Sequence, residues 1–217
     1  MNYRFIKYFL ALTVPFLAYF SFNGTGIITY APMIEAFLAI PLLELFFKPN
    51  SINLNEAEEE MAKEDKSYDI VLYLLVPIIF FLLWEFLLSM RENISLFDKI
   101  GRILSMGLIC GGFGINVAHE LGHRNNKLEQ FLSKTLLLSS LYMHFFIEHN
   151  RGHHKRVSTK EDPSSARYGE NIFSFWLRSV FSGYVSAWNI EFKRLKRINK
   201  YKFSLENEML RFQIIQL

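Results

Sequence analysis

The chain has 217 residues, of which 51% are hydrophobic and 16% aromatic, and its net charge is only +3. Its single cysteine, Cys110, excludes a disulfide framework, a cysteine-ligated iron–sulfur cluster and a thiolate zinc site. A chain of this length fits one domain, 1–217, and we expect no nucleic acid partner.

Four apolar runs in the first half of the chain are each long enough to cross about 30 Å of hydrocarbon. The runs are residues 5–22, 27–47, 70–90 and 100–118. We predict a transmembrane helix for each, with a tight turn at 23–26. The sequence therefore predicts an all-α integral membrane protein, with four transmembrane helices over 5–118 and a cytoplasmic histidine-box and interfacial region over 119–217.

Two acidic features lie among these runs. Residues 49–67 contain six Asp or Glu residues, which favours a solvated cytoplasmic loop over a cation site. Glu35 falls near the middle of the second run. A carboxylate at mid-membrane depth is a functional-site candidate by default, and a neutral acid hydrogen-bonded between helices is an equal alternative.

All six histidines fall between positions 119 and 154. The first two belong to the sequence HELGH, as His119 and His123. A spacing of i,i+4 on a helix places both rings on one face, which suits the ligation of one metal ion. We assign both histidines as candidate metal ligands.

The second set lies in EHNRGHH, residues 148–154. His149 and His153 repeat the i,i+4 spacing if this segment is helical. The adjacent His153 and His154 would then point about 100° apart, so they could serve two different ions. We predict that His144 has a second-shell or packing role. Glu120 and Glu148 are expected to orient the ligand imidazoles as second-shell partners.

The metal follows from the donor types. HELGH also matches the zinc-protease signature, in which Glu120 would be the general base. A catalytic zinc takes three protein ligands and one water, which leaves histidines of the second set without a purpose. Imidazole-rich sites without thiolate suit iron and O2 chemistry, so we predict two non-haem irons. A third alternative, a metal-binding transport component, predicts ligands within the bilayer.

The segments around and after the histidines bear on topology. The apolar run 132–147 is predicted not to cross the membrane, because a crossing would separate the two histidine sets that one diiron centre must join. Arg and Lys residues flank this run, in agreement with the positive-inside rule. Residues 172–190 look amphipathic and suited to the membrane interface. The basic cluster over 193–202 indicates either a cytoplasmic location or a docking patch for an acidic partner.

These segments together resemble a known family. HELGHR at 119–124, EHNRGHHKRVSTKEDPSSARYGE at 148–170, and the following FWLRS and AWNIEFKRLKR closely resemble the membrane alkane hydroxylases (alkane 1-monooxygenase), part of the histidine-box group with fatty acid desaturases and xylene monooxygenase. The likeness covers roughly 98–217, and Asn150 favours the alkane branch. It implies six transmembrane helices and a cytoplasmic cap that holds two irons. The ligands implied in this sequence are His119, His123, His149, His153 and His154.

The resemblance also implies an activity. It is hydroxylation of the terminal methyl group of alkanes with O2, using electrons from NADH through rubredoxin reductase and rubredoxin, at a cell inner membrane with the histidine boxes on the cytoplasmic side. Membrane lipid and an alkane substrate are the further partners expected. Alternatives in the same group are a fatty acyl desaturase and a xylene-type hydroxylase. Because the family's third histidine box comes later, we expect a C-terminally truncated member without hydroxylase activity on its own.

Overall fold

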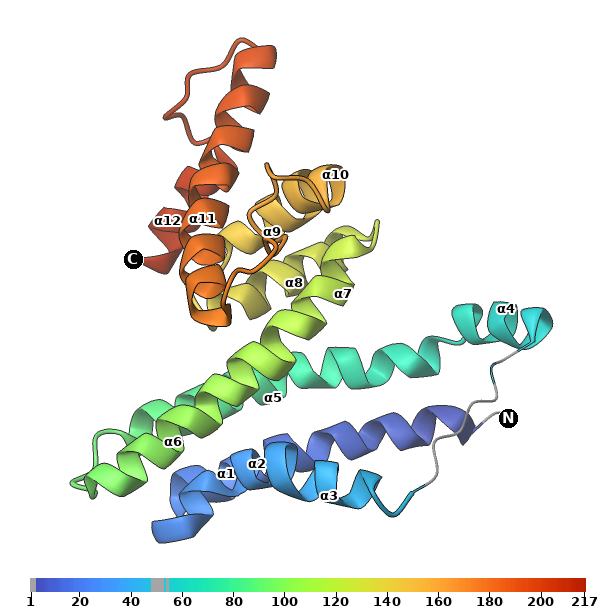
Figure 1. Cartoon of the computed structure of the whole chain (residues 1–217), viewed down its shortest axis with the longest axis vertical. Coiled ribbons are helices and arrows are strands. Elements are labelled where there is room, and N and C mark those ends of the chain that lie inside the picture. The colour runs from blue at the N-terminus through green and yellow to red at the C-terminus, as the bar shows by residue number, and fades with distance from the viewer. Residues whose placement is uncertain (1–2, 48–52, 54) are drawn as a thin grey trace. The chain divides into compact units, whose positions relative to one another are not determined.

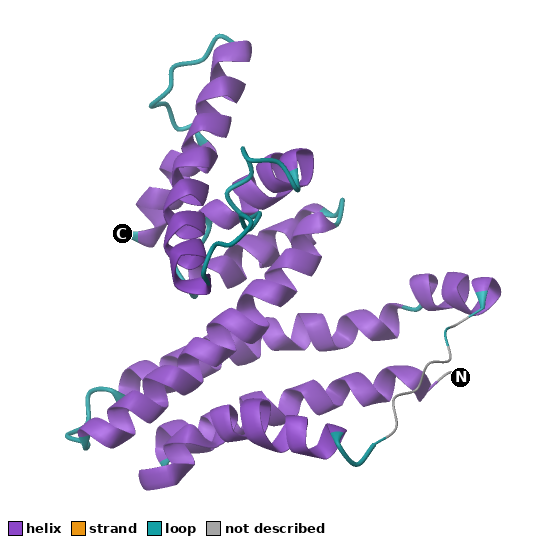
Figure 2. Ribbon diagram, viewed as in Figure 1, coloured by secondary structure: helices purple, strands orange, loops and turns teal. Residues whose placement is uncertain are grey.

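The computed structural model describes residues 3–47, 53 and 55–217, and every regular element in these ranges is a helix (Figures 1 and 2). This result confirms the predicted all-α fold. The chain divides into two compact units, Met1–Val117 and Ala118–Leu217.

The first unit consists of helical segments, several of which follow one another without a break. In chain order they are η1 (Tyr3–Leu12), α1 (Thr13–Asn23), η2 (Gly26–Tyr30), α2 (Ala31–Ile34), η3 (Glu35–Ala39), α3 (Ile40–Glu44), α4 (Glu56–Glu64), η4 (Lys66–Tyr68), α5 (Asp69–Ser89), α6 (Leu96–Leu108) and η5 (Ile109–Ile115).

Three helices in the described ranges are long and apolar enough to cross a membrane. They are Gly26–Glu44, Lys66–Ser89 and Leu96–His123, and they coincide with the second, third and fourth predicted runs. The first predicted run, 5–22, also forms a helix, as η1 and α1. It is not among these three helices, so its crossing stays a prediction.

The packing of the first unit depends on close approach between α6 and η2. A Cβ atom on Gly101 would collide with the side chains of Thr29 and Tyr30, so only glycine allows this contact. Ser95 caps α6 through a 3.1 Å bond from the backbone N–H of Asp98, a type of cap worth about 1 kcal/mol. The Asp98 carboxylate in turn accepts from the backbone N–H of Gly26, 2.6 Å away, in the predicted 23–26 turn.

Glu35 forms a hydrogen bond between two helices. Its carboxyl oxygen lies 2.6 Å from the hydroxyl of Thr13 in α1. Glu35 also begins the π-helical segment η3, a type of bulge that widens a helix locally. The expected bond between helices is therefore present, and the protonation state of Glu35 stays a prediction.

The sequence analysis expected a loop over the acidic segment 49–67, but part of this segment is helical. Residues 48–52 and 54 lie outside the described ranges, but Glu56–Glu64 form helix α4. Asn55 and Glu58 make a capping box, in which the Asn55 side chain accepts from the Glu58 backbone N–H and the Glu58 carboxylate accepts from the Asn55 backbone N–H. This reciprocal cap and the acidic first turn stabilise the N-terminus of the helix, which is why the loop prediction was wrong.

The second unit begins within α7 and carries the remaining helices. They are α7 (Asn116–His123), α8 (Lys127–Leu138), α9 (His144–Glu148), η6 (His149–His153), α10 (His154–Arg156), α11 (Ile172–Arg197) and α12 (Glu208–Gln216). Helix α9 packs against α8 and α11, and α12 packs against α11 (Figure 1).

The apolar run 132–147 is split between two of these helices. Helix α8 ends at Leu138 and α9 begins at His144, with Leu141 between them at a φ of 53°. Neither piece is long enough to span about 30 Å. The break fits the prediction that this run does not cross the membrane, and the topology itself stays a prediction.

Helix α11 is longer than the amphipathic segment 172–190 predicted from the sequence. Asn171 caps it through a 2.9 Å bond from the Ser174 backbone N–H. Its first half exposes the large apolar side chains of Phe173, Trp176 and Phe181. This surface is of the kind expected at a membrane interface, and its location there stays a prediction.

Candidate metal centre

The first pair of histidines lies at the end of α7. His119 and His123 are one α-helical turn apart, and their Nε2 atoms are 3.0 Å from each other, as the i,i+4 spacing predicted. Helix α7 is held by packing against α8, where the Ser133 hydroxyl donates to the Ala118 carbonyl at 2.6 Å. A Cβ atom on Gly122 would lie only 3.0 Å from that hydroxyl oxygen. The small residue in HELGH therefore lets the two helices approach.

The second set of histidines lies on a π-helical turn, η6, rather than on an α-helix. A π-helix repeats at i+5, so the turn aligns His149 with His154. Their Nε2 atoms are 2.9 Å apart. The predicted pairing of His149 with His153 is therefore wrong, because it assumed an α-helical repeat. His153 is displaced to the side, with its ring stacked on that of His149 at 5.3 Å between centroids.

The two pairs converge on one point. The Nε2 atom of His123 lies 3.1 Å from that of His149 and 3.2 Å from that of His154. The candidate ligand atoms of His119, His123, His149 and His154 all lie within 4.8 Å of one another. Two nitrogens bound at right angles to one metal at about 2.1 Å are about 3.0 Å apart. The four imidazoles therefore have the spacing of a ligand set for one ion.

The electrostatics of the cluster also favour metal binding. Burial and the neighbouring imidazoles lower the pKa of His149 to about 3. The ring is therefore neutral at physiological pH, and neutral imidazole is the form that binds a metal. The Nε2 atoms of His123, His149 and His154 all contact one another. Each neutral ring nitrogen is either a donor or an acceptor, so at least one of these three contacts cannot be a hydrogen bond, whereas one cation between the nitrogens could accept a lone pair from each. The donor set fits a first-row transition metal.

His153 has a carboxylate partner that the sequence analysis missed. Its Nδ1 atom lies 2.8 Å from a carboxylate oxygen of Asp162, whose side chain is buried. Burial acts to raise the pKa of Asp162, but hydrogen bonds from Ser165, Ser164 and His153 outweigh it and leave the pKa below its usual value. The sequence did contain a signal for the position of Asp162. In DPSS, residues 162–165, Asp is followed two and three residues later by Ser, which is typical of a turn in which the carboxylate accepts local hydrogen bonds.

The three predicted second-shell residues lie in different surroundings. Glu120 is half exposed and accepts from Arg124 at 3.2 Å. Glu148 is buried and accepts from Arg156 at 2.8 Å, although burial still leaves its pKa above the usual value. His144 is buried between the rings of Tyr142 and Tyr184, and burial lowers its pKa to about 4. The packing role predicted for His144 agrees with this position.

Arg151 ties the π-helical turn to the rest of the second unit. Its guanidinium donates to Glu191 of α11 at 2.9 Å and to Glu208 of α12 at 2.7 Å. Glu191 is fully buried and also accepts from Arg194. Lys134 of α8 donates to Glu208 at 2.7 Å. This ionic network, which we call the Arg151 network, joins the histidine segment to three helices.

Three helices that are apolar enough to cross a membrane and a histidine cluster that could hold a metal ion fit the class of membrane metalloproteins. Residues 100–216 match the family model described as fatty acid desaturase. The chain therefore belongs to the fatty acid desaturase family, whose histidine-box members are membrane proteins of the non-haem iron type.

Curated relatives refine this assignment. The chain is 34% identical over 178 residues to alkane 1-monooxygenase 1 of Alcanivorax borkumensis, with 81% of this chain and 44% of the relative covered. It is 37% identical over 174 residues to alkane 1-monooxygenase of Acinetobacter baylyi, with 80% and 42% covered. The hydroxylase component of a xylene/toluene monooxygenase from Pseudomonas putida is 26% identical over 117 residues, with 54% and 32% covered. The chain spans about half the length of the curated relatives it matches.

Proposed function

We propose that this chain forms the iron-binding half of a non-haem diiron monooxygenase that hydroxylates the terminal methyl group of alkanes. The observation that carries the proposal is the convergence of four Nε2 atoms from two separate sequence motifs, in a chain similar to several alkane 1-monooxygenases. When bound, the iron supplies the activation of O2 and the oxidation of the C–H bond.

The residues of the chain hold and orient the metal. His119, His123, His149 and His154 would hold one ion through Nε2, and His153 would be a ligand of the second ion. Glu148 and the Arg151 network fix the π-helical turn, which carries His149 and His153 and is followed directly by His154. Because outer partners fix the ring orientation, they raise metal affinity without touching the ion.

The remaining parts of the proposal concern partners and location. We place the protein in a cell inner membrane, with the histidines on the cytoplasmic side. The basic residues of the 193–202 segment support this orientation. The similarity to alkane 1-monooxygenases supports an electron-transfer protein as the source of electrons, in agreement with the single cysteine of these 217 residues, which cannot hold an iron–sulfur cluster. We propose rubredoxin, reduced by rubredoxin reductase, as this donor.

Two measurements test the proposal. Metal analysis of the purified chain should find iron, and stoichiometric zinc would instead support a protease. For activity, the chain replaces the matching segment of the Acinetobacter baylyi alkane 1-monooxygenase, and the chimera is assayed with rubredoxin, its reductase and NADH. We expect primary alcohol from octane or hexadecane, and none when His119→Ala is introduced. Turnover of an acyl thioester or of xylene, with alkanes left unchanged, would assign the chain to another branch of the family.

A further inference from the structure

Asp162 has a buried carboxylate that faces His153, the histidine of EHNRGHH that lies outside the four-histidine cluster. One oxygen lies 2.8 Å from Nδ1 of His153 and 2.5 Å from the Ser165 hydroxyl, which donates to it. The other oxygen accepts from the Ser164 backbone N–H at 3.0 Å. The side chain of Asp162 is completely buried, whereas that of His153 is 22% exposed. Two residues of its own loop therefore hold the carboxylate, in addition to its contact with the imidazole.

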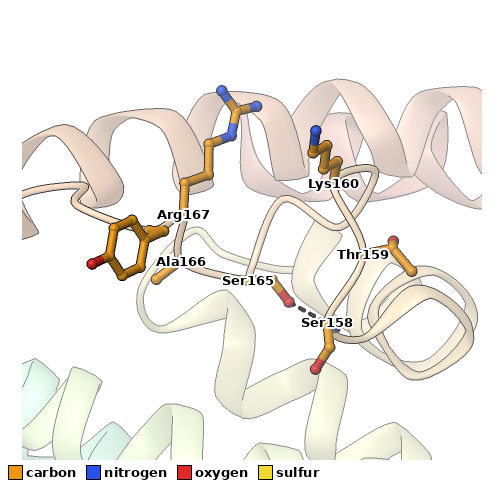
Figure 3. A pocket seen from close by; sticks show the side chains of 7 residues that line it. Ser158, Thr159, Lys160, Ser165, Ala166 and Arg167 are labelled. Carbon is orange, nitrogen blue, oxygen red and sulfur yellow. Dashed lines mark hydrogen bonds between the residues drawn. The ribbon is translucent and has the colours of Figure 1, made fainter.

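The loop that carries Asp162 is closed on itself and fastened to α11. The Ser158 backbone N–H donates to the Ser165 hydroxyl oxygen at 2.9 Å across the loop (Figure 3). Arg178 of α11 donates to the carbonyl oxygens of Pro163 at 3.0 Å and Ser165 at 2.9 Å. The Glu170 carboxylate accepts a hydrogen bond from the same guanidinium at 2.6 Å. These bonds hold the loop at Ser158, before Asp162, and at Pro163 and Ser165, after it, and none of them involves His153.

A fixed acceptor at Nδ1 selects one form of the imidazole ring. A neutral imidazole carries a single proton, and an ionised carboxylate can only accept, so the proton lies on Nδ1 and the lone pair on Nε2. The four clustered histidines also meet one another through Nε2. The ring of His153 lies 5.3 Å from that of His149 and 5.6 Å from that of His154, centroid to centroid. The free lone pair of His153 would then be on Nε2, the same nitrogen through which the four clustered histidines meet.

We propose that Asp162 is a positioning residue, which sets the tautomer and the ring orientation of His153 so that Nε2 of this histidine can bind a metal ion. The inference rests on the proposed function in one respect, namely that His153 is a ligand. The tautomer itself is a property of the metal-free chain. Positioning partners of this kind change metal affinity by about 10- to 100-fold when they are removed.

The first experiment needs no metal. The full chain is labelled with ¹⁵N at histidine, placed in lipid nanodiscs at about pH 8, where imidazoles are neutral, and its ring nitrogens are measured by NMR. His153→Gln identifies the His153 signals. We expect Nδ1 of His153 to carry the proton in the wild type, and Asp162→Ala to move a large part of the population to the Nε2–H form. A dominant Nε2–H form in the wild type would overturn the proposal.

The second experiment measures Fe²⁺ and Co²⁺ binding by the same variants. Asp162→Ala should weaken binding at one of two ions by about 10- to 100-fold and change the visible spectrum of the cobalt form. The matched control is Glu161→Gln, which removes an exposed neighbouring charge and should match the wild type. If Asp162→Ala does not fold, Asp162→Leu decides, because leucine has a similar shape but cannot accept a hydrogen bond. An unchanged tautomer and affinity in that variant would contradict the proposal. If the wild type binds no metal but shows the Nδ1–H tautomer, the proposed function fails while the tautomer assignment stands.

Discussion

The two units of the chain differ in the kind of side chain that they bury. In the first unit the buried side chains are mostly apolar, and Asp98 is its one buried carboxylate among the described residues. In the second unit five carboxylates are buried, those of Glu129, Glu148, Asp162, Glu191 and Glu208. Each of these five contacts an Arg, Lys or His side chain, whereas Asp98 accepts from the backbone N–H of Gly26 and from Ser95.

This difference follows from what each unit has to hold in place. An apolar helix in lipid is stabilised by close packing and by its own backbone hydrogen bonds. A cluster of neutral imidazoles has no such support, because each ring must be aimed at a point. The second unit therefore uses ionic contacts with defined directions, which are costly to bury but geometrically specific. The following predictions test this division.

The largest effect is expected at the histidine cluster. His149→Ala should weaken metal binding by about a thousandfold, since a four-ligand site contributes on the order of 10–16 kcal/mol in total. His144→Ala is the control, because His144 lies among tyrosine rings outside the cluster, and it should retain metal. Isothermal titration with Fe²⁺ or Co²⁺ measures both. Equal losses in the two variants would mean that the cluster is not the site.

The next effect concerns the Arg151 network. Glu191→Ala removes a fully buried carboxylate that accepts from Arg151 and Arg194. It should cost about 3 kcal/mol of unfolding free energy, the lower end for a broken buried pair because both arginines are partly exposed. Glu206→Ala removes the exposed partner of Lys200 and should cost less than about 1 kcal/mol. Chemical denaturation in detergent compares the two, and similar losses would argue against a network that holds the site.

The pH dependence of stability should reveal the buried histidine. Burial lowers the pKa of His144 to about 4 in the folded chain, from an ordinary value of 6.5. As pH falls through 6.5, the His144 side chain gains a proton in the unfolded chain but not in the folded chain. The free energy of unfolding therefore decreases until pH reaches about 4. The metal-free wild type should lose roughly 2–3 kcal/mol more than His144→Phe between about pH 7.5 and 4.5. Parallel stability curves for the two proteins would contradict this expectation.

A smaller effect is expected in the first unit, where packing dominates. Gly101→Ala places a methyl group against Thr29 and Tyr30 and should cost about 1–2 kcal/mol. Gly107→Ala is the matched control in the same helix, because no atom outside the local helix backbone lies within 4 Å of its added Cβ. Unfolding by SDS in mixed micelles measures the difference. A loss for Gly107→Ala as large as that for Gly101→Ala would show that the packing was assigned to the wrong glycine.

The smallest effect is expected for Glu120→Gln. The Glu120 side chain is 54% exposed and pairs with Arg124, so metal affinity should change by less than about threefold. The sequence analysis predicted instead that Glu120 orients a ligand imidazole. A loss of about tenfold or more in Co²⁺ affinity would support that earlier prediction.

Much of this molecule could be predicted from local patterns. Hydropathy located three helices that are long enough to cross a membrane, and the clustering of six histidines located the metal centre. The acidic helix α4 also had a local signal, since Asn55 with Glu58 three residues later is a capping box. The high density of charge in this segment favours a loop, but the capping box was the stronger signal.

Other features depend on contacts that the sequence does not display. Gly107 and Gly111 have the small-xxx-small spacing typical of helix packing in membranes, yet a Cβ on either meets nothing within 4 Å, and Gly101 makes the close contact instead. Asp162 lies nine residues from His153 and becomes its partner only because the intervening loop folds back. The π-helical turn was missed because an α-helical repeat was assumed, and no local composition rule separates the two at EHNRGHH.

The π-helical turn makes the histidine centre sensitive to the number of residues, and not only to their identity. A segment of α-helix with one residue fewer between 149 and 154 would return the two histidines to an i,i+4 relation and keep them on one face, but everything after that point would rotate by about 100°. Val157 and the loop that carries Asp162 would then leave α10 in a different direction. Gly152 adds a second restriction, since any Cβ there would collide with the carboxylate of Glu148 and meet Arg156. Apart from Gly152, a point substitution in this turn changes one side chain, whereas a single-residue insertion or deletion changes the direction of every side chain after it and so separates the imidazoles from their supports.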